Sequence, residues 1–410
     1  MKRLLLAIGV AATLIACNNE EDPKPNERRD IILSANEEVL SDDCVDFAFR
    51  FFKQTQRKEA KQKNWMISPL SLTYALSMTA NGADEKTLDE IRTTLGFGDI
   101  AMEEINLYNK KIVEQLKTLD NTAKFNSANS IWVDDSITLL DDFINTNRQM
   151  YDAEVSNIDA SSDECKKTIN KWCAQKTNNC IPEIYPQEES LDFNVLLINA
   201  IYFNGKWNGK FEVSETQEPF YNANGTTTQT NMMNMKKELK YGENDKFRLV
   251  EIPYGNGAFS MVIMLPQHGV ELDEAIDYMN ATRWSNIVDS EGFATTVKTN
   301  VTMPRFEITY KESLVNSLMA MGIKEAFTTN ANFSKISNTS LFITDVIQST
   351  TLKVNEKGSE AAATTVVNME ITSPSPTPKE ETFNVNKPFV FVIKEQSTNT
   401  FIFMGKMTHL

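Results

Sequence analysis

The pattern of apolar and polar positions changes half-way along the chain. In the first half, apolar side chains recur at the three- and four-residue intervals of amphipathic helices. This spacing predicts helices over residues 41–52, 69–80, 84–95, 102–118, 140–151 and 161–177, the first two beginning at the capping sequences Ser41-Asp42 and Ser68-Pro69. In the second half, runs rich in Val, Ile, Phe and Thr predict strands over residues 194–203, 259–265, 294–310, 341–355, 389–393 and 400–407. No linker or repeat separates the halves, so we expect one α+β domain of about 375 residues.

The N-terminus has the pattern of an export signal. Lys2 and Arg3 are followed by thirteen uncharged, mostly apolar residues and then Cys17, a run shorter than the roughly 20 residues that span a bilayer. The sequence LIAC at residues 14–17 resembles a bacterial lipobox, which predicts a signal peptide over residues 1–16 and an acylated Cys17. An ordinary signal peptide with a chance cysteine is the alternative.

The residues after the lipobox are expected to form a lipid-anchored, flexible tether over residues 17–35. Residues 18–30 are polar, contain two prolines and lack an apolar face. Together with the lipobox, they predict an exported protein anchored to the bacterial outer membrane, at the cell surface or the periplasmic face.

Composition limits the chemistry of the chain. Its 410 residues carry 41 Lys and Arg against 56 Asp and Glu, a formal net charge of −15, with no basic run. Nucleic acid is therefore not expected as a partner. The two histidines are His268, in a Pro-Gln-His-Gly turn, and His409, next to last. Nucleophilic catalysis needs a positioned base, so we expect neither an enzyme nor a cofactor.

The four cysteines after Cys17 are expected to be buried free thiols. Cys165 and Cys173 fall two turns apart on a predicted helix, too far for a disulfide. A Cys173–Cys180 disulfide stays open as an alternative, since export permits it. Without a CxxC pair or clustered histidines, no metal site is expected.

The segment 356–387 differs from the rest of the chain. It has hardly any large apolar residue before Val366 and then three prolines, Pro374, Pro376 and Pro378. Such a stretch inside a compact domain is either disordered or functional. Its opening, EKGSEAAATT at residues 356–365, closely resembles the hinge of the reactive loop in serpins, which are protease inhibitors that change shape.

Further motifs with the same resemblance follow in family order over nearly the whole mature chain. They are NWMISPLSLTYALSMTANG at 64–82, NAIYF at 199–203 followed by Lys206-Trp207, MPRF at 303–306, FNVNKPFVFVI at 383–393 and FMGK at 403–406. The resemblance implies a serpin domain over residues 36–410, with a large five-stranded mixed sheet, two smaller sheets, about nine helices and an exposed reactive loop at about residues 356–382.

The resemblance also implies a function, that of a monomeric inhibitor of serine endopeptidases that acts as a suicide substrate. A protease cleaves the loop and forms an acyl-enzyme; residues 359–372 then insert as a new central strand and trap the protease before hydrolysis. A non-inhibitory, serpin-like surface binding protein is the alternative.

The loop composition suits insertion. The hinge residues are Glu356, Gly358, Ser359, Glu360, Ala361, Ala362, Ala363, Thr364 and Thr365. Strand alternation would turn Ser359, Ala361, Ala363, Thr365, Val367 and Met369 inward. No proline lies between Ser359 and Ser373, as a central strand requires, because proline cannot donate to the ladder.

The reactive bond is expected at Thr372-Ser373, from the family's usual spacing after Gly358. Counting back from Pro388 lands near Thr377 instead, so the loop is longer than usual, and the prolines after Ser373 favour the first position. The secondary candidates for the bond involve Val367, Asn368, Met369, Glu370 and Ile371.

The expected targets follow from the side chains around this bond. The absence of Arg and Lys from residues 358–378 argues against trypsin-like proteases. Thr, Val and Met favour elastase-like, chymotrypsin-like or subtilisin-like enzymes, and Ile371 would also suit papain-like cysteine proteases.

Several polar residues match positions that control sheet opening in the family. Ser68, Ser71 and Asn199 match groups that hydrogen-bond beneath the central strands, and Trp207 matches the point where the loop enters the sheet. There the family commonly has His-Lys-Ala, whereas this chain has Gln348-Ser349-Thr350, so a histidine that could respond to pH is missing. Each of these polar residues could equally be satisfied core.

No glycosaminoglycan site is expected on the helix over residues 102–118. Its lysines (Lys110, Lys111 and Lys117) are balanced by Glu103, Glu104 and Glu114.

Overall fold

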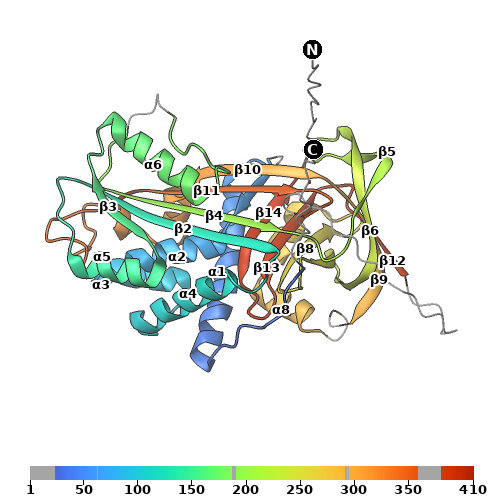
Figure 1. Ribbon diagram of the computed structural model, residues 1–410, viewed down its shortest axis with the longest axis horizontal. Helices are drawn as coiled ribbons and strands as arrows, with labels where there is room; N and C mark the ends of the chain where they lie inside the picture. Colours follow the sequence, from blue (N-terminus) through green and yellow to red (C-terminus); the bar gives the residue numbers. More distant parts are fainter. Residues whose placement is uncertain (1–23, 62, 187–190, 291–292, 294, 359–379) are drawn as a thin grey trace, which may run out of the picture.

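The computed structural model of the chain describes residues 24–61, 63–186, 191–290, 293, 295–358 and 380–410. In this part of the chain, two β-sheets are covered by helices (Figure 1). The helices are α1 (Ala35–Lys58), α2 (Pro69–Ala80), α3 (Glu85–Leu95), α4 (Met102–Leu116), α5 (Asp141–Tyr151), α6 (Asp163–Lys176), α7 (Leu272–Tyr278), α8 (Ala281–Val288) and α10 (Val315–Met321), with a short 3-10 helix at Glu325–Phe327.

The first sheet is five-stranded and mixed. Its order is β10 (Phe306–Ser313), β11 (Ile343–Val354), β4 (Val195–Gly205), β2 (Ala123–Asp134) and β3 (Glu154–Ile158). The central pair, β11 and β4, is parallel, whereas β10–β11 and β4–β2 are antiparallel. This confirms the large mixed sheet that the serpin resemblance implied.

The second sheet has nine strands. Its path runs β1 (Trp65–Ile67), β14 (Phe401–Met407), β13 (Phe389–Glu395), β8 (Phe259–Pro266), β7 (Phe247–Pro253), β6 (Thr227–Glu243), β9 (Thr296–Pro304) and β12 (Glu380–Asn384), with β5 (Glu212–Tyr221) paired to β6. The two smaller sheets expected from the family are here joined, because the 17-residue β6 pairs with β7 near one end and with β5 near the other.

The helices predicted from apolar spacing are present, and one predicted start is wrong. The helix expected from Ser41-Asp42 begins at Ala35, because Ser34 caps it and its backbone N–H donates to Glu37 Oε2 at 2.7 Å. Ser41 lies inside the helix, where its hydroxyl donates to the carbonyl of Thr398 at 2.8 Å. The start of α2 is as predicted, with Ser68 as N-cap and Pro69 at its first position.

The run at residues 294–310, predicted as one strand, forms two strands in different sheets. It divides at Arg305, after Pro304; β9 pairs with β6, and β10 pairs with β11. In β10, the buried residues Phe306, Ile308 and Tyr310 alternate with exposed ones, which is the pattern of a strand with one covered face.

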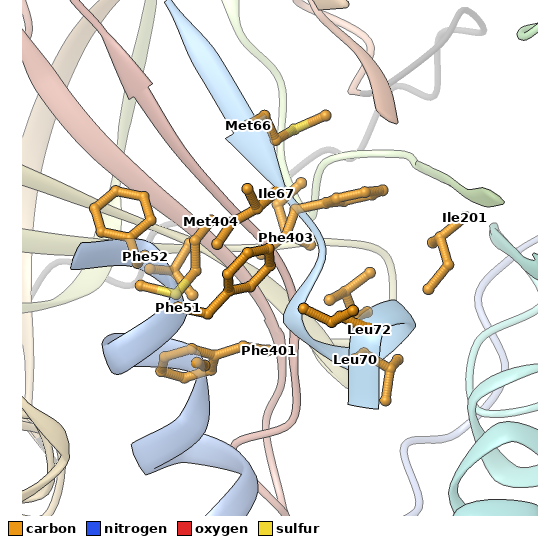
Figure 2. Packing of buried hydrophobic residues seen from close by; sticks show 14 of the residues in the cluster. Phe51, Phe52, Met66, Ile67, Leu70, Leu72, Ile201, Phe401, Phe403 and Met404 are labelled. Atoms are coloured by element: carbon orange, nitrogen blue, oxygen red, sulfur yellow. The ribbon is translucent and has the colours of Figure 1, made fainter. Parts of the chain in front are cut away.

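Each face of the five-stranded sheet packs on different helices (Figure 1). On one face, α6 forms a small core in which the Trp132 and Trp172 rings meet edge to face, 6.2 Å apart. The other face joins the main core with α1, α2 and the nine-stranded sheet. Figure 2 shows Phe51 of α1, Ile67 of β1 and Phe403 of β14 in this core. The start of α2 lies against the middle of the five-stranded sheet, because Ser68 and Ser71 form hydrogen bonds with Gln348 and Asn199.

The expected tether, residues 17–35, is described only from Lys24 onward, and that part does not form a free linker. Asn26 exchanges hydrogen bonds with Asn121, and Ile31 is buried in the main core. The prediction relied on the polarity, the prolines and the missing apolar face of residues 18–30, whereas this segment is held by hydrogen bonds of Asn26 and by the burial of Ile31. Cys17 lies outside the described residues.

Among the described cysteines, Cys44, Cys165 and Cys173 are free thiols, so the Cys173–Cys180 disulfide is not formed. Burial raises the pKa of Cys173 to about 12. In the described part of the chain, no helix combines the length and apolarity needed to cross a bilayer, and no cluster of three potential metal ligands occurs.

Candidate functional site

The central strands β4 and β11 separate at one end of the five-stranded sheet. They pair directly from Val195 with Ile343 to Ile201 with Thr350. Beyond this pair, and among the described strands, residues 351–354 of β11 pair only with β10, and residues 202–205 of β4 pair only with β2. The parallel pair is therefore joined over most of its length and open at the end where β11 leads into the predicted hinge.

A tight turn closes the chain at this open end. Asn355 and Gly358 exchange backbone hydrogen bonds of 3.0 and 3.1 Å, and Gly358 also forms a bridge with Lys206. Gly358 has φ of +123°, and a Cβ atom on it would lie 2.0 Å from the carbonyl oxygen of Gly205. Glycine is required here because both the conformation and the space exclude a side chain.

The flanks of this turn are held by an ion pair and a tryptophan. Glu356 forms an ion pair with Arg305, which lies between β9 and β10. The indole Nε1–H of Trp207 donates to the carbonyl of Asn355 at 2.8 Å, and its ring stacks on Tyr254 at 4.3 Å with an interplanar angle of 10°. We call this group (Lys206, Trp207, Tyr254, Asn355 and Gly358) the loop entry.

Three buried amides form a row across the middle of the sheet. Gln348 of β11 lies opposite Asn199 of β4, and Asn199 lies opposite Asn129 of β2. All three are at most 3% exposed. The Asn199 amide group donates to Asn129 Oδ1 and, at 3.0 Å, to the carbonyl of Ser71. We call Asn129, Asn199 and Gln348 the amide row.

The N-cap residue of α2, Ser68, is hydrogen-bonded to the amide row. Gln348 makes two hydrogen bonds of 2.9 Å with the backbone of Ser68, accepting from its N–H and donating to its carbonyl. The Ser68 hydroxyl donates to the carbonyl of Ile402 at 2.7 Å and accepts from the N–H of Ser71 at 3.3 Å. The N-cap residue of α2, Ser68, thus connects β11 to β14 of the second sheet.

Two buried polar atoms at this junction have no hydrogen-bond partner among the described residues. They are Asn199 Oδ1 and Ser71 Oγ. An unsatisfied buried polar atom costs roughly 1–3 kcal/mol. The closed sheet therefore leaves hydrogen-bonding capacity unused at its centre.

Comparison with protein families identifies the architecture built above. The family model described as "Serpin (serine protease inhibitor)" matches residues 42–410. The chain belongs to the serpin family. A serine protease inhibitor of Cyanea capillata is 32% identical to this serpin, over 85% of this chain and 93% of that protein.

Solved structures agree with this assignment. The thermophilic serpin tengpin in its native state is 28% identical and has a TM-score of 0.80, covering 95% of this chain and 98% of that chain. Human thyroxine-binding globulin has a TM-score of 0.81 at 24% identity, covering 92% of this chain and 99% of that chain, a likeness that shows the fold alone. At the level of the family, serpins inhibit proteases rather than catalyse a reaction.

The residues expected to control opening of this serpin fall into two groups. Ser68, Ser71 and Asn199 lie together below the central strands, and Trp207 lies at the loop entry. Gln348, which was expected near Trp207, lies instead in the amide row. The reason is register: Gln348 pairs with Asn199, and Asn355, seven residues further along, meets Trp207.

The predicted loop residues lie largely outside the described part of the chain. Glu356 and Gly358 are described at the turn, whereas Ser359, Glu360, Ala361, Ala362, Ala363, Thr364, Thr365 and the reactive-bond candidates Val367, Asn368, Met369, Glu370, Ile371, Thr372 and Ser373 are not.

Sequence reasoning missed four residues that hold the site together: Asn129, Tyr254, Arg305 and Asn355. Asn129 carried a usable signal, since NSANSIW at residues 126–132 places polar residues beside strand-forming ones. The other three act through contacts between segments that are far apart in the sequence.

Proposed function

We propose that this serpin inhibits serine endopeptidases by inserting its cleaved reactive loop between β4 and β11. The observation that carries the proposal is the central pair itself: two parallel strands, joined directly and open at the hinge end. An antiparallel strand can extend from the turn at Asn355 and Gly358 into the space between them.

We infer the register of such a strand from the turn. Asn355 and Gly358 form an antiparallel pair, so each step back along β11 corresponds to one step forward along the loop. Seven steps place Thr365 opposite Gln348, and five steps place Ala363 opposite Thr350. Opposed residues of an antiparallel pair point to the same face. Gln348 and Thr350 both hydrogen-bond toward α2 and β1, so the odd-numbered loop residues would face inward, as strand alternation predicted.

Insertion in this register would complete the amide row. Thr365 would separate Gln348 from Asn199, which now lie opposite each other. Its hydroxyl could donate to Asn199 Oδ1, which has no partner among the residues described in the closed sheet. The inserted form is thus favoured by hydrogen bonds that the closed form lacks, in addition to those of the new ladder.

The proposed targets follow from the loop sequence. We place the reactive bond at Thr372-Ser373 and expect elastase-like, chymotrypsin-like or subtilisin-like serine proteases, because no Arg or Lys occurs from residue 358 to 378. Papain-like cysteine proteases are further candidates because of Ile371. The LIAC sequence supports export and a lipid anchor at Cys17.

The decisive experiment mixes the mature protein with elastase, subtilisin or papain and examines the products by SDS gel electrophoresis. We expect a complex with the serine proteases that resists SDS, because the acyl-enzyme is covalent, and mass analysis of the released C-terminal peptide should locate the cleaved bond. Ala363→Arg is the matched control: it leaves Thr372-Ser373 intact but places a charge at a buried position of the new strand, so cleavage without a complex is expected. Loop cleavage of the wild-type protein with no complex would favour the non-inhibitory binding protein instead.

A further inference from the structure

The N-terminal segment of the described chain, residues 24–31, contacts both sides of the loop entry. On one side is the loop over residues 119–122, which leads into β2. The Asn26 N–H donates to Asn121 Oδ1 at 3.1 Å, and the Asn121 N–H donates back to Asn26 Oδ1 at 2.9 Å. The Asn26 amide group also donates to the carbonyl of Leu119 at 3.0 Å.

On the other side, the same segment contacts two turns of the nine-stranded sheet. Arg28 donates to the carbonyl of Gly257 at 3.2 Å, in the turn between β7 and β8. The Ile31 N–H donates to the Ser397 hydroxyl at 2.9 Å, in the turn between β13 and β14, and the Ile31 side chain is buried. Asn256 links the two sides, since its amide group donates to both Asn26 Oδ1 and the carbonyl of Leu119.

The two sides belong to parts of the protein that must move apart when a strand enters. The loop over residues 119–122 is continuous with β2, and β2 pairs with β4 along its length, from Ala123 with Gly205 to Val133 with Val195. These strands must shift away from β11 together. The turn over residues 254–257 belongs to the nine-stranded sheet, into which the proposed insertion adds no strand.

The contacts continue without a break to the hinge. The Lys206 carbonyl accepts from Gly255 at 2.7 Å, Tyr254 stacks on Trp207, and Trp207 donates to Asn355. Residues 24–31 thus stabilise the contacts by which the loop entry is attached to the nine-stranded sheet.

We propose that residues 24–31 hold the loop entry closed and slow the insertion of the reactive loop. This inference rests on the proposed function, since it concerns the regulation of the same site. A segment that bridges a moving and a fixed part must release one of them before the sheet opens, so it raises the barrier to opening. Removal or displacement of these residues would make the inhibitor insert its loop sooner, whether or not a protease is attached.

The test measures how fast the mature, uncleaved protein takes up a synthetic peptide of residues 359–372. Uptake is followed by native gel mobility and by tryptophan fluorescence, because Trp207 lies at the loop entry. The variant Asn26→Ala removes the side-chain hydrogen bonds to the Leu119 carbonyl, the Asn121 N–H and the Asn256 amide group, and keeps the bond from the Asn26 N–H to Asn121. Since one hydrogen bond changes an equilibrium by roughly a factor of two to ten and Asn26 is partly exposed, we expect about fivefold faster uptake.

Two further variants keep the test decisive. Asn121→Ala removes the acceptor of the Asn26 N–H and the bond from the Asn121 amide group to the carbonyl of Lys24. It should also accelerate uptake, and the double variant should be at least as fast as the faster single one, because the two changes remove different hydrogen bonds of the same segment. Arg29→Ala, an exposed neighbour with no hydrogen bond or ion pair described, is the control and should match the wild type.

The outcomes separate this inference from the proposed function. If wild type and Asn26→Ala take up the peptide at the same rate, the inference is wrong and the proposed function stands. Acceleration by Arg29→Ala as well would show general loosening and would also overturn the inference. If no variant takes up the peptide and loop cleavage of the wild-type protein yields no trapped protease, the proposed function fails and the inference with it.

Discussion

Asn199 is buried at the centre of the five-stranded sheet, yet its side-chain oxygen has no hydrogen-bond partner among the described residues. Its neighbours in the amide row, Asn129 and Gln348, do not titrate, and neither do Ser68 and Ser71. In place of the histidine that the family commonly has, Gln348 forms two neutral hydrogen bonds with Ser68. These groups do not change protonation between pH 5 and 8, so we expect the proposed opening to exchange hydrogen-bond partners at this point.

In the proposed register of the inserted strand, Thr365 is the residue that supplies the new hydrogen-bond partner of Asn199. Thr365→Val keeps the shape of the side chain but leaves Asn199 Oδ1 unpaired in the inserted form, at a cost of roughly 1–3 kcal/mol. Slower insertion gives the acyl-enzyme more time to hydrolyse, so we expect less trapped protease and more cleaved inhibitor on an SDS gel. Residue 364 would face the opposite side of the sheet, so Thr364→Val should give the same ratio of trapped protease to cleaved inhibitor as the wild type. An equal ratio in the Thr365→Val and Thr364→Val variants would contradict the register.

At the scale of elements, the sequence predicted those whose apolar pattern is simple. The helix α2 and the strands β8, β13 and β14 agree with their predicted ranges to within a few residues. The strand β2 was not predicted, because buried polar residues such as Asn129 and Ser130 interrupt its apolar alternation. The strand β6 was not predicted because its buried residues do not alternate regularly: Met232 and Met233 are adjacent. Motifs located the hinge glycine and Ser68, but the pairing of Gln348 with Asn199 depends on the register of strands 149 positions apart, which periodicity does not encode.

The helix α1 contains a crowded carboxyl group that gives a prediction at this scale. Burial, with the neighbouring charges of Asp46 and Asp42, raises the pKa of Asp43 from 3.8 to about 6, and Arg50 opposes the shift. The folded state therefore holds this proton more tightly than the unfolded chain, so the contribution of Asp43 to stability is present below about pH 4 and is lost as the pH rises to about 6.

Asp43→Asn removes this pH-dependent loss. Because the side chain is partly exposed, we expect the variant to raise the free energy of unfolding at pH 8 by only about 1 kcal/mol. The gain should be smaller at pH 5, and urea unfolding at the two pH values measures it. Glu38→Gln, an exposed change on the same helix, should show no such difference, and an equal gain at both pH values would contradict the assigned cause.

At the scale of the whole molecule, the closed five-stranded sheet is proposed to be kinetically rather than thermodynamically stable. The hydrogen bonds that lead from Asn199 of β4 through Ser71 and Ser68 to Gln348 of β11 resist separation of β4 from β11. The packing of α6 over the sheet and the contacts of residues 24–31 resist it as well. These contacts lie in different parts of the fold, and each must loosen before a strand can enter. The free-energy barrier to sheet opening thus arises from contacts in several parts of the fold. The stabilisation that insertion provides comes from the hydrogen bonds of one new strand.

Cleavage of the loop should allow it to insert, and so should stabilise the protein against unfolding, even when no protease is trapped. Each backbone hydrogen bond of the new strand contributes roughly 0.5–1.5 kcal/mol, so the cleaved wild-type protein should unfold at a clearly higher denaturant concentration than the uncleaved one. Ala363→Pro removes a backbone donor opposite Thr350 and bends the strand near its start. The uncleaved variant should unfold like the uncleaved wild type, but cleavage should leave its midpoint nearly unchanged. Ala363→Ser, which keeps the donor and the small size, should regain most of the increase. A cleaved wild-type protein that is no more stable than the uncleaved one would show that this sheet does not accept its loop.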